Sequence, residues 1–113
     1  MAIDAALAAS IRTILHQHLP AEVITEKTLF GGLAFMVRGH MCATVSGRDG
    51  VEVMLRIGKN AHDAALRENG VRTTIMRGRE YRGYIDLDTE ALPRLQYWLE
   101  QALAYNRTLK AKP

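Results

Sequence analysis

Apolar residues recur at steps of three and four along the N-terminal part of the chain. The repeat comprises Ile3, Leu7, Ile11, Ile14 and Leu15. This spacing places the apolar side chains on one face of an amphipathic helix. Asp4 is a suitable N-cap for this helix, and Pro20 cannot continue it. The pattern therefore predicts an N-terminal helix that ends before residue 20.

From Val23 onward the apolar period shortens to two, which is typical of strands. Apolar residues alternate with polar ones through Phe30, and the alternation resumes in residues 33–37, 41–45 and 51–57. Turn sequences separate these runs at residues 38–40 and 47–50. We therefore predict four consecutive strands that form the central part of an antiparallel sheet.

A short helix and two further strands are predicted next. Asn60 is the expected N-cap of an Ala-rich helix, and Asn69-Gly70 is its expected C-terminal stop. The strands cover residues 73–76 and 81–87, and the intervening residues 77–79 read as a hairpin turn.

The C-terminal residues predict a final helix. Residues 88–90 are expected to form a polar connection, and Pro93 suits the first turn of a helix with inward-facing Leu95, Leu99, Ala102 and Leu103. We expect residues 110–113 to form a frayed tail. The complete order is α-β-β-β-β-α-β-β-α, which predicts one α+β domain over residues 1–113.

Composition supports a soluble globular class. The chain is 48% apolar and 24% charged, and these values favour neither a disordered nor a membrane protein. The N-terminus lacks the pattern of a secretory signal, and the single Cys42 cannot form an internal disulfide. We therefore expect a cytoplasmic protein. A net charge of +3 would tolerate an acidic partner without requiring one.

Candidate catalytic and metal-binding residues lack partners at suitable spacings. His40 and Cys42 could form a base and nucleophile, but the sequence shows no orienting acid nearby. His16 and His18 diverge on a helix, and His62 is expected to face solvent. We therefore predict no enzyme activity, no metal site and no cofactor.

A glycine-rich segment carries a structural motif instead of a phosphate-binding one. Gly31-Gly32 lacks the context of a nucleotide-binding loop, and a strand follows it. We expect a bulge or a corner at these two residues. The residues assigned to this motif along the chain are Phe30, Gly31, Gly32, Gly39, Gly78 and Gly83.

Several of these residues carry a resemblance to a known family. They are Leu29-Phe30-Gly31-Gly32, Phe35, Gly39, Met41-Cys42, Leu55-Arg56-Ile57-Gly58, Gly78-Arg79, Gly83-Tyr84 and the Trp98-Leu99 to Ala102-Leu103 segment. In their order and spacing, the chain resembles the TfoX/Sxy N-terminal domain family over roughly residues 23–107. The resemblance implies an antiparallel sheet with packed helices, like that of secretion chaperones. It also implies a role like that of the family's transcriptional co-regulators of natural competence genes.

Two surfaces are candidates for interaction. A basic cluster comprises Arg72, Arg77, Arg79 and Arg82, interleaved with tyrosines, and its candidate contact residues are Arg77, Arg79, Arg82 and Tyr84. Met36 and Met54 lie on the second face of the predicted sheet and form a candidate dimer face.

These features leave three hypotheses. The first is a non-enzymatic regulatory module that binds another protein and forms a homodimer. The second is a weak nucleic-acid binder that uses the arginines at positions 72, 77, 79 and 82. The third is a small-molecule-binding protein or enzyme with a pocket near Gly31, Gly32, His40 and Cys42.

Overall fold

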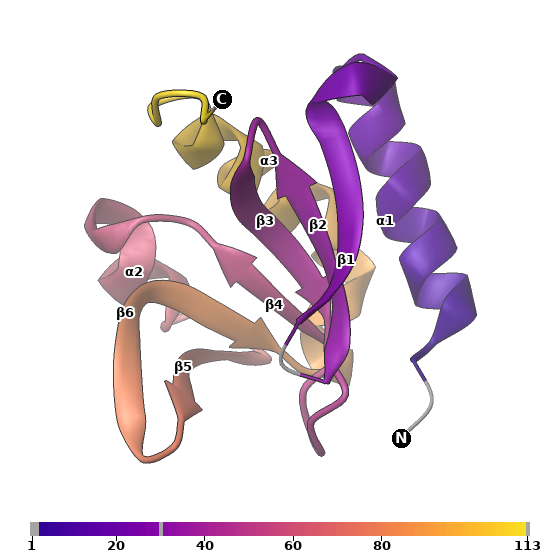
Figure 1. The fold of residues 1–113 in the computed structure, drawn as a ribbon. Helices are drawn as coiled ribbons and strands as arrows, with labels where there is room; N and C mark the ends of the chain where they lie inside the picture. Colours follow the sequence, from indigo (N-terminus) through magenta and orange to yellow (C-terminus); the bar gives the residue numbers. More distant parts are fainter. Residues whose placement is uncertain (1–2, 30, 113) are drawn as a thin grey trace.

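The structure, a computed structural model, describes residues 3–29 and 31–112, which form three α-helices, six strands and two short 3₁₀ helices (Figure 1). This order confirms the predicted α+β class and the predicted succession of elements. No α-helix in these two ranges has both the length and the apolar character that crossing a membrane requires. The α-helices are α1 (Ala5–His18), α2 (Lys59–Ala65) and α3 (Leu95–Asn106), and the 3₁₀ helices are η1 (Ala21–Val23) and η2 (Thr89–Arg94). The strands are β1 (Ile24–Leu29), β2 (Gly32–Val37), β3 (His40–Val45), β4 (Val53–Arg56), β5 (Val71–Met76) and β6 (Arg79–Leu87).

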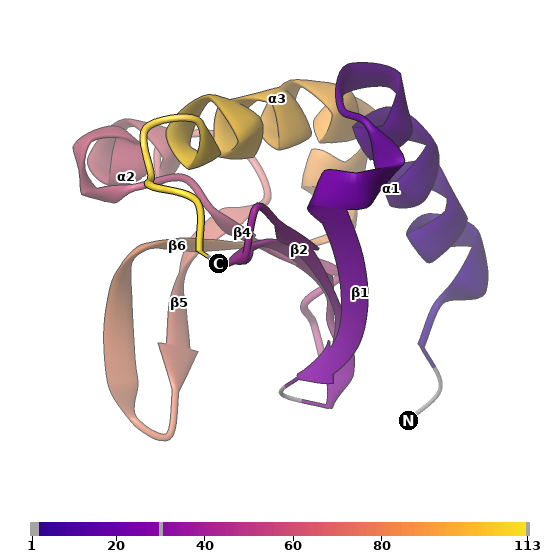
Figure 2. The ribbon, with the colours of Figure 1, turned by 45° about the horizontal axis from the view of Figure 1, so that its top comes forward.

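The described strands form one antiparallel sheet in the order β1-β2-β3-β4-β6-β5. The first four strands are neighbours in space as in sequence. β6 then pairs with β4, with Ile85 opposite Leu55, and leaves β5 at the edge. Figure 2 shows the described α-helices over one face of the sheet, whose two ends curve away from them. This arrangement has two layers around one core.

Local sequence determines some helix ends but not all of them. Asp4 caps α1 as predicted, because its carboxylate accepts a hydrogen bond from the Leu7 N–H at 3.0 Å. The prediction of Asn60 as the N-cap of α2 is wrong. Gly58 takes this position, since the chain leaves β4 there with a φ of 87°, a conformation that favours glycine.

The polar connection expected at residues 88–90 joins β6 to a 3₁₀ helix, and the prediction that Pro93 lies in the first turn of the final α-helix is wrong. Asp88 caps η2, because its carboxylate accepts a hydrogen bond from the Glu90 N–H at 2.8 Å. Pro93 lies inside η2, so α3 begins only at Leu95.

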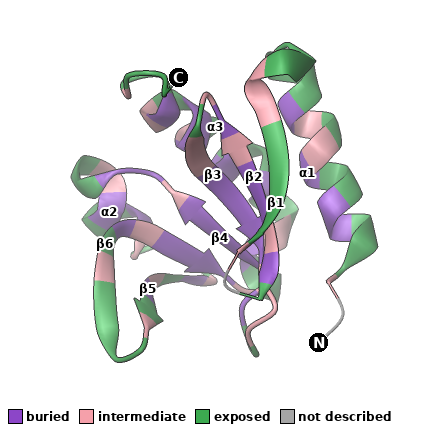
Figure 3. Cartoon of the chain, viewed as in Figure 1, coloured by how far each residue is buried: buried purple, intermediate pink, exposed green. Residues whose placement is uncertain are grey.

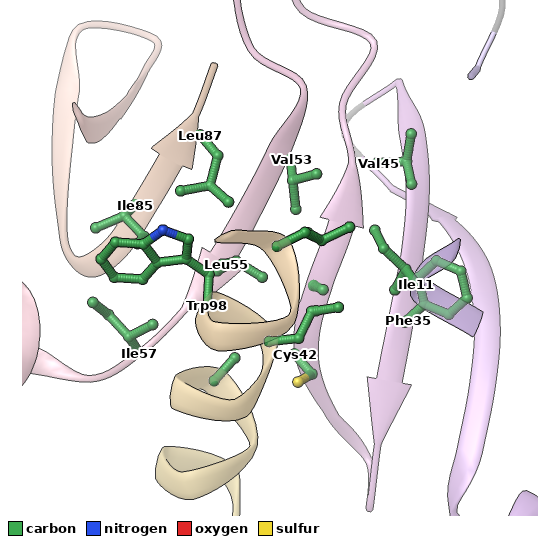
Figure 4. Packing of buried hydrophobic residues seen from close by; sticks show 14 of the residues in the cluster. Ile11, Phe35, Cys42, Val45, Val53, Leu55, Ile57, Ile85, Leu87 and Trp98 are labelled. Atoms are coloured by element: carbon green, nitrogen blue, oxygen red, sulfur yellow. The ribbon is translucent and has the colours of Figure 1, made fainter. Parts of the chain in front are cut away.

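The helices and the inner sheet face enclose an apolar core (Figure 4). Trp98 of α3 is 3% exposed and lies near Leu55, Ile57 and Ile85 in this view. Ile11 of α1 is fully buried and belongs to the same cluster. Because burial of one such side chain stabilises the folded state by about 1.5–3 kcal/mol, these contacts hold the helices on the sheet.

β1 forms one edge of the sheet and exposes mainly polar side chains (Figure 3). Arg12 of α1 donates hydrogen bonds to both carboxylate oxygens of Glu26, at 2.6 and 2.8 Å. The hydrogen bonds from Arg12 lower the pKa of Glu26. Glu26 and the neighbouring Lys27 place charges along this edge, and such charges oppose the addition of another strand.

A polar cluster lies on the opposite sheet face, over β4, β6 and the edge strand β5. Asp86 is 4% exposed, and its carboxylate accepts hydrogen bonds from Arg48 and Thr74, each at 2.8 Å. The Arg48 guanidinium also lies 3.7 Å from the sulfur of Met54, which is 2% exposed. The prediction that Met54 belongs to an open apolar dimer face is therefore wrong. Met36 is half-buried, and the homodimer itself stays a prediction.

The segment after α3 is bound to the turn between β2 and β3. The Lys112 N–H donates a hydrogen bond to the Arg38 carbonyl at 3.0 Å. The Arg38 guanidinium in turn donates to the carbonyls of Asn106 and Leu109, at 3.1 and 3.0 Å. The expectation of a frayed tail over residues 110–113 is therefore wrong for residues 110–112, and residue 113 lies outside the described residues.

Gly32 touches the backbone of β3, and we expect Gly32→Ala to destabilise the fold. A Cβ at this position would lie 2.2 Å from the Val45 carbonyl oxygen. The strands would have to shift, so the free energy of unfolding should fall by about 1–3 kcal/mol in denaturant titrations. Gly31→Asn is the control, because Gly31 has a φ of 73° that Asn tolerates, with open space around it. Wild-type stability in Gly32→Ala would contradict the close contact.

Candidate functional site

A cleft of about 640 Å³ opens between α2, α3, β4 and β6. Its lining comes from residues 56–61, from residues 82–84 and from Gln101, Ala104, Tyr105 and Thr108. Figure 2 shows α2 and α3 above β4 and β6, which supply Arg56 and residues 82–84 of this lining. The cleft therefore exists only because the fold brings three separate parts of the chain together.

Close packing at Gly58 shapes the cleft. A Cβ at this residue would lie 2.4 Å from Cδ1 of Tyr105, so the tyrosine ring occupies the space of a side chain. The N–H groups of Ile57 and Gly58 both donate hydrogen bonds to the Gly83 carbonyl, at 2.8 and 3.0 Å. These contacts hold the β4–α2 junction against β6 and α3.

The buried His62 side chain connects α2 to the β5–β6 hairpin through hydrogen bonds. Its Nδ1 accepts a hydrogen bond from the Gly83 N–H at 3.0 Å, which places the proton of the neutral ring on Nε2. Nε2 lies 3.0 Å from the Thr73 hydroxyl, which donates to Glu80 at 3.0 Å. The expectation of a solvent-facing His62 is wrong, since this side chain is fully buried. His62 precedes the buried Ala65 by three residues, and this helical spacing was the sequence signal that could have indicated a buried His62.

Arg56 lies between two tyrosines at the cleft. Its guanidinium carbon is 5.6 Å from the ring centre of Tyr84 and 5.5 Å from that of Tyr105. Both distances are within the range of cation–π attraction. Arg56 and Tyr84 are also register partners on β4 and β6. The sequence interpretation missed Arg56 and Tyr105 as site residues, because their meeting depends on the packing of α3 over Gly58.

Three cationic side chains line the cleft: Arg56, Lys59 and Arg82. No carboxylate is among the described residues that line it. Arg82 forms an ion pair with Asp63 at 3.2 Å outside the lining, but both side chains are largely exposed and such pairs are weak. The cleft is therefore electropositive.

The structure separates the members of the predicted basic cluster. Arg82 and Tyr84 reach the cleft. Arg77 occupies the hairpin turn with a φ of 54°, and Arg79 follows it at the start of β6, with both side chains exposed. Arg72 donates a hydrogen bond to the Gly50 carbonyl at 2.6 Å. Two of the four arginines thus lie at the hairpin tip and two lie elsewhere.

His40 and Cys42 have separate surroundings. The Nε2 atom of His40 lies 2.7 Å from the Lys110 carbonyl oxygen. Cys42 is 1% exposed, and burial raises the pKa of its thiol to about 12. A thiol with this pKa stays protonated at neutral pH and is a poor nucleophile. Gly31 lies in the β1–β2 turn, which confirms the expected corner, and Phe30 lies outside the described residues.

The histidines of α1 are exposed. His16 and His18 both point to solvent, and the His18 ring lies 3.7 Å from Glu100. Across residues 3–29 and 31–112, no three His, Cys, Asp or Glu side chains converge in a group that could hold a metal ion.

Comparison with known proteins identifies the family. Residues 17–105 match the model of the TfoX N-terminal domain, and this span is most of the chain. The chain therefore belongs to the TfoX N-terminal domain family, which confirms the resemblance seen in the sequence. No curated protein and no solved structure matches the chain, so the likeness to secretion chaperones stays a prediction. Arg56, Tyr84 and Tyr105 all lie inside the matched span.

The buried thiol predicts how stability depends on pH. Unfolded chains lose the Cys42 proton near the ordinary pKa of 9.0, whereas the folded protein keeps it up to about 12. The free energy of unfolding should therefore fall as pH rises above about 9, because the unfolded state then binds fewer protons. Cys42→Ala lacks this contribution and is the control. Parallel denaturant titrations should show the wild-type stability falling further than that of Cys42→Ala, and equal falls would contradict the burial.

The His62 contacts predict a second stability effect. His62→Leu leaves the Gly83 N–H without its acceptor inside the protein, and the free energy of unfolding should fall by about 1–3 kcal/mol. Amide exchange at Gly83 should also become faster than in the wild type. Glu80→Gln is the control, because this exposed side chain can still accept a hydrogen bond from Thr73. Unchanged exchange at Gly83 in His62→Leu would show that the hydrogen bond does not hold α2.

Proposed function

We propose that this domain is a non-enzymatic regulatory module that acts in the cytoplasm and controls transcription by binding another protein. Its membership of the TfoX N-terminal domain family supports this proposal, since the family members with known roles are transcriptional co-regulators of competence genes. A fold alone does not define a function, so the proposal also needs a surface that suits a protein partner.

The observation that carries the proposal is the hairpin arm, which comprises β5, β6 and their turn. Figures 1 and 2 show the arm projecting away from the helices, and Figure 3 shows that its tip is exposed. Ile75 is 54% exposed there, close in sequence to the exposed Arg77 and Arg79. A large apolar residue beside arginines favours a protein contact surface, because arginine is enriched at interfaces and the apolar side chain gains from burial.

The alternative functions have less support from the geometry. Nucleic-acid binding through the arm would rely on Arg77 and Arg79, since Arg72 contacts Gly50 and Arg82 lies at the cleft. Two phosphate contacts give only weak binding, because each neutralised phosphate contributes a small amount of counterion release. Catalysis by Cys42 would need a thiolate, which burial of this side chain opposes.

Replacement of Ile75 tests the proposed surface. We expect affinity capture with the wild-type domain to enrich a transcription protein, and Ile75→Asp to reduce that enrichment by about tenfold, because a charge would have to be desolvated in the contact. The direct affinity of the captured protein for each variant, measured by calorimetry, should show the same loss.

Tyr97→Ser is the matched control. Tyr97 is 41% exposed on α3, away from the arm, so this variant also removes an exposed large hydrophobic residue. It should retain the partner. Loss of the partner in both variants, or in neither, would contradict the assignment of the arm. Capture of metabolic enzymes alone, with no transcription protein, would contradict the proposed regulatory role.

A further inference from the structure

Arg56 has hydrogen-bonding capacity that the described protein atoms do not use. Its side chain is half-buried, and its guanidinium carbon lies 5.6 and 5.5 Å from the ring centres of Tyr84 and Tyr105. Within residues 3–29 and 31–112, no carboxylate or carbonyl forms a hydrogen bond or ion pair with this group, and its nitrogen atoms remain accessible from the cleft. A guanidinium is suited to bidentate hydrogen bonds with phosphate or carboxylate groups, so these accessible nitrogen atoms could bind an external anion.

The rest of the cleft favours the same kind of ligand. Lys59 and Arg82 add two cations to Arg56, and the lining holds amide and hydroxyl groups on Asn60, Gln101 and Thr108. Arg82 already pairs with Asp63, which leaves the charges of Arg56 and Lys59, and a carboxylate would balance only one of these two. A phosphate monoester carries a charge of about −1.5 to −2 at neutral pH and has three strong acceptor oxygens for the forked guanidinium.

We propose that this cleft binds the phosphate group of a small phosphorylated molecule, with Arg56 as the central contact. The volume of about 640 Å³ exceeds what a phosphate group alone needs and is typical of sites for small organic ligands. The exposed parts of Tyr84 and Tyr105 then border the organic part of the ligand. This site is separate from the hairpin tip, so the inference does not rest on the proposed protein contact.

Titration followed by amide NMR at constant ionic strength tests the site, with inorganic phosphate, adenosine 5′-monophosphate and adenosine as probes. Both phosphates should bind saturably, with shifts concentrated in residues 56–61, 82–84 and 101–108. Adenosine should produce no saturable shift in these residues, because it lacks the phosphate group. Absence of saturable binding by both phosphates up to about 10 mM would overturn the proposal. Equal binding of adenosine and adenosine 5′-monophosphate would overturn it as well.

Substitutions then separate a built site from general positive charge. Arg56→Gln should weaken binding of adenosine 5′-monophosphate by about tenfold or more, because a charge-assisted hydrogen bond is lost. Lys59→Gln, at an exposed position that the fold does not need, should weaken binding by about threefold. Arg79→Gln is the matched control and should bind as the wild type does, since Arg79 lies at the hairpin tip.

Two outcomes of the substitutions would reject the site. One is an equal loss of affinity in Arg79→Gln and Lys59→Gln, which would indicate attraction by net charge alone. The other is wild-type affinity in Arg56→Gln, since this residue is the central contact of the proposed site. Ile75→Asp should leave phosphate binding unchanged, so failure of the protein-contact proposal and failure of this one can be told apart.

Discussion

The hydrogen bond from the Gly83 N–H to Nδ1 of His62 is the interaction on which the cleft side of the domain depends. It joins a seven-residue helix, too short to be stable by itself, to the middle of β6. The Gly83 carbonyl meanwhile accepts the N–H groups of Ile57 and Gly58, so both polar groups of one residue hold the β4–α2 junction. Tyr105 can then pack on Gly58, and this contact brings α3 to the cleft.

The two sheet faces are closed by different chemistry. Apolar side chains from α1 and α3 cover one face, whereas Arg48, Thr74 and Asp86 form a polar cluster on the other, over β4, β6 and β5. The Asp86 carboxylate is buried whereas Arg48 is partly exposed, so loss of Arg48 would leave a buried charge unpaired and would be costly. No described α-helix packs on this second face, so the curved ends of the sheet remain accessible from that side.

Periodicity in the sequence was sufficient to predict the order of the elements, because residues 51–57 and α1 show their buried faces directly in the spacing of apolar residues. Asp4 was predictable for the same reason, since capping is local. His62, Met54 and residues 110–112 were misjudged because their surroundings come from distant segments. The sequence predicted part of the site. Arg82 and Tyr84 belong to a local cluster that the sequence shows, whereas Arg56 and Tyr105 meet only through tertiary packing.

The unequal edges of the sheet limit how copies of the domain can associate. β1 presents Glu26 and Lys27 in its middle, whereas β5 carries Arg72 near its start and no charge at residues 73–76. An incoming strand would therefore add more readily along residues 73–76 of β5 than along β1. Two copies joined through β5 would use up both permissive edges and leave a β1 strand at each outer end. Strand addition would thus end in a closed pair, and the same asymmetry would protect the domain from growth into fibres.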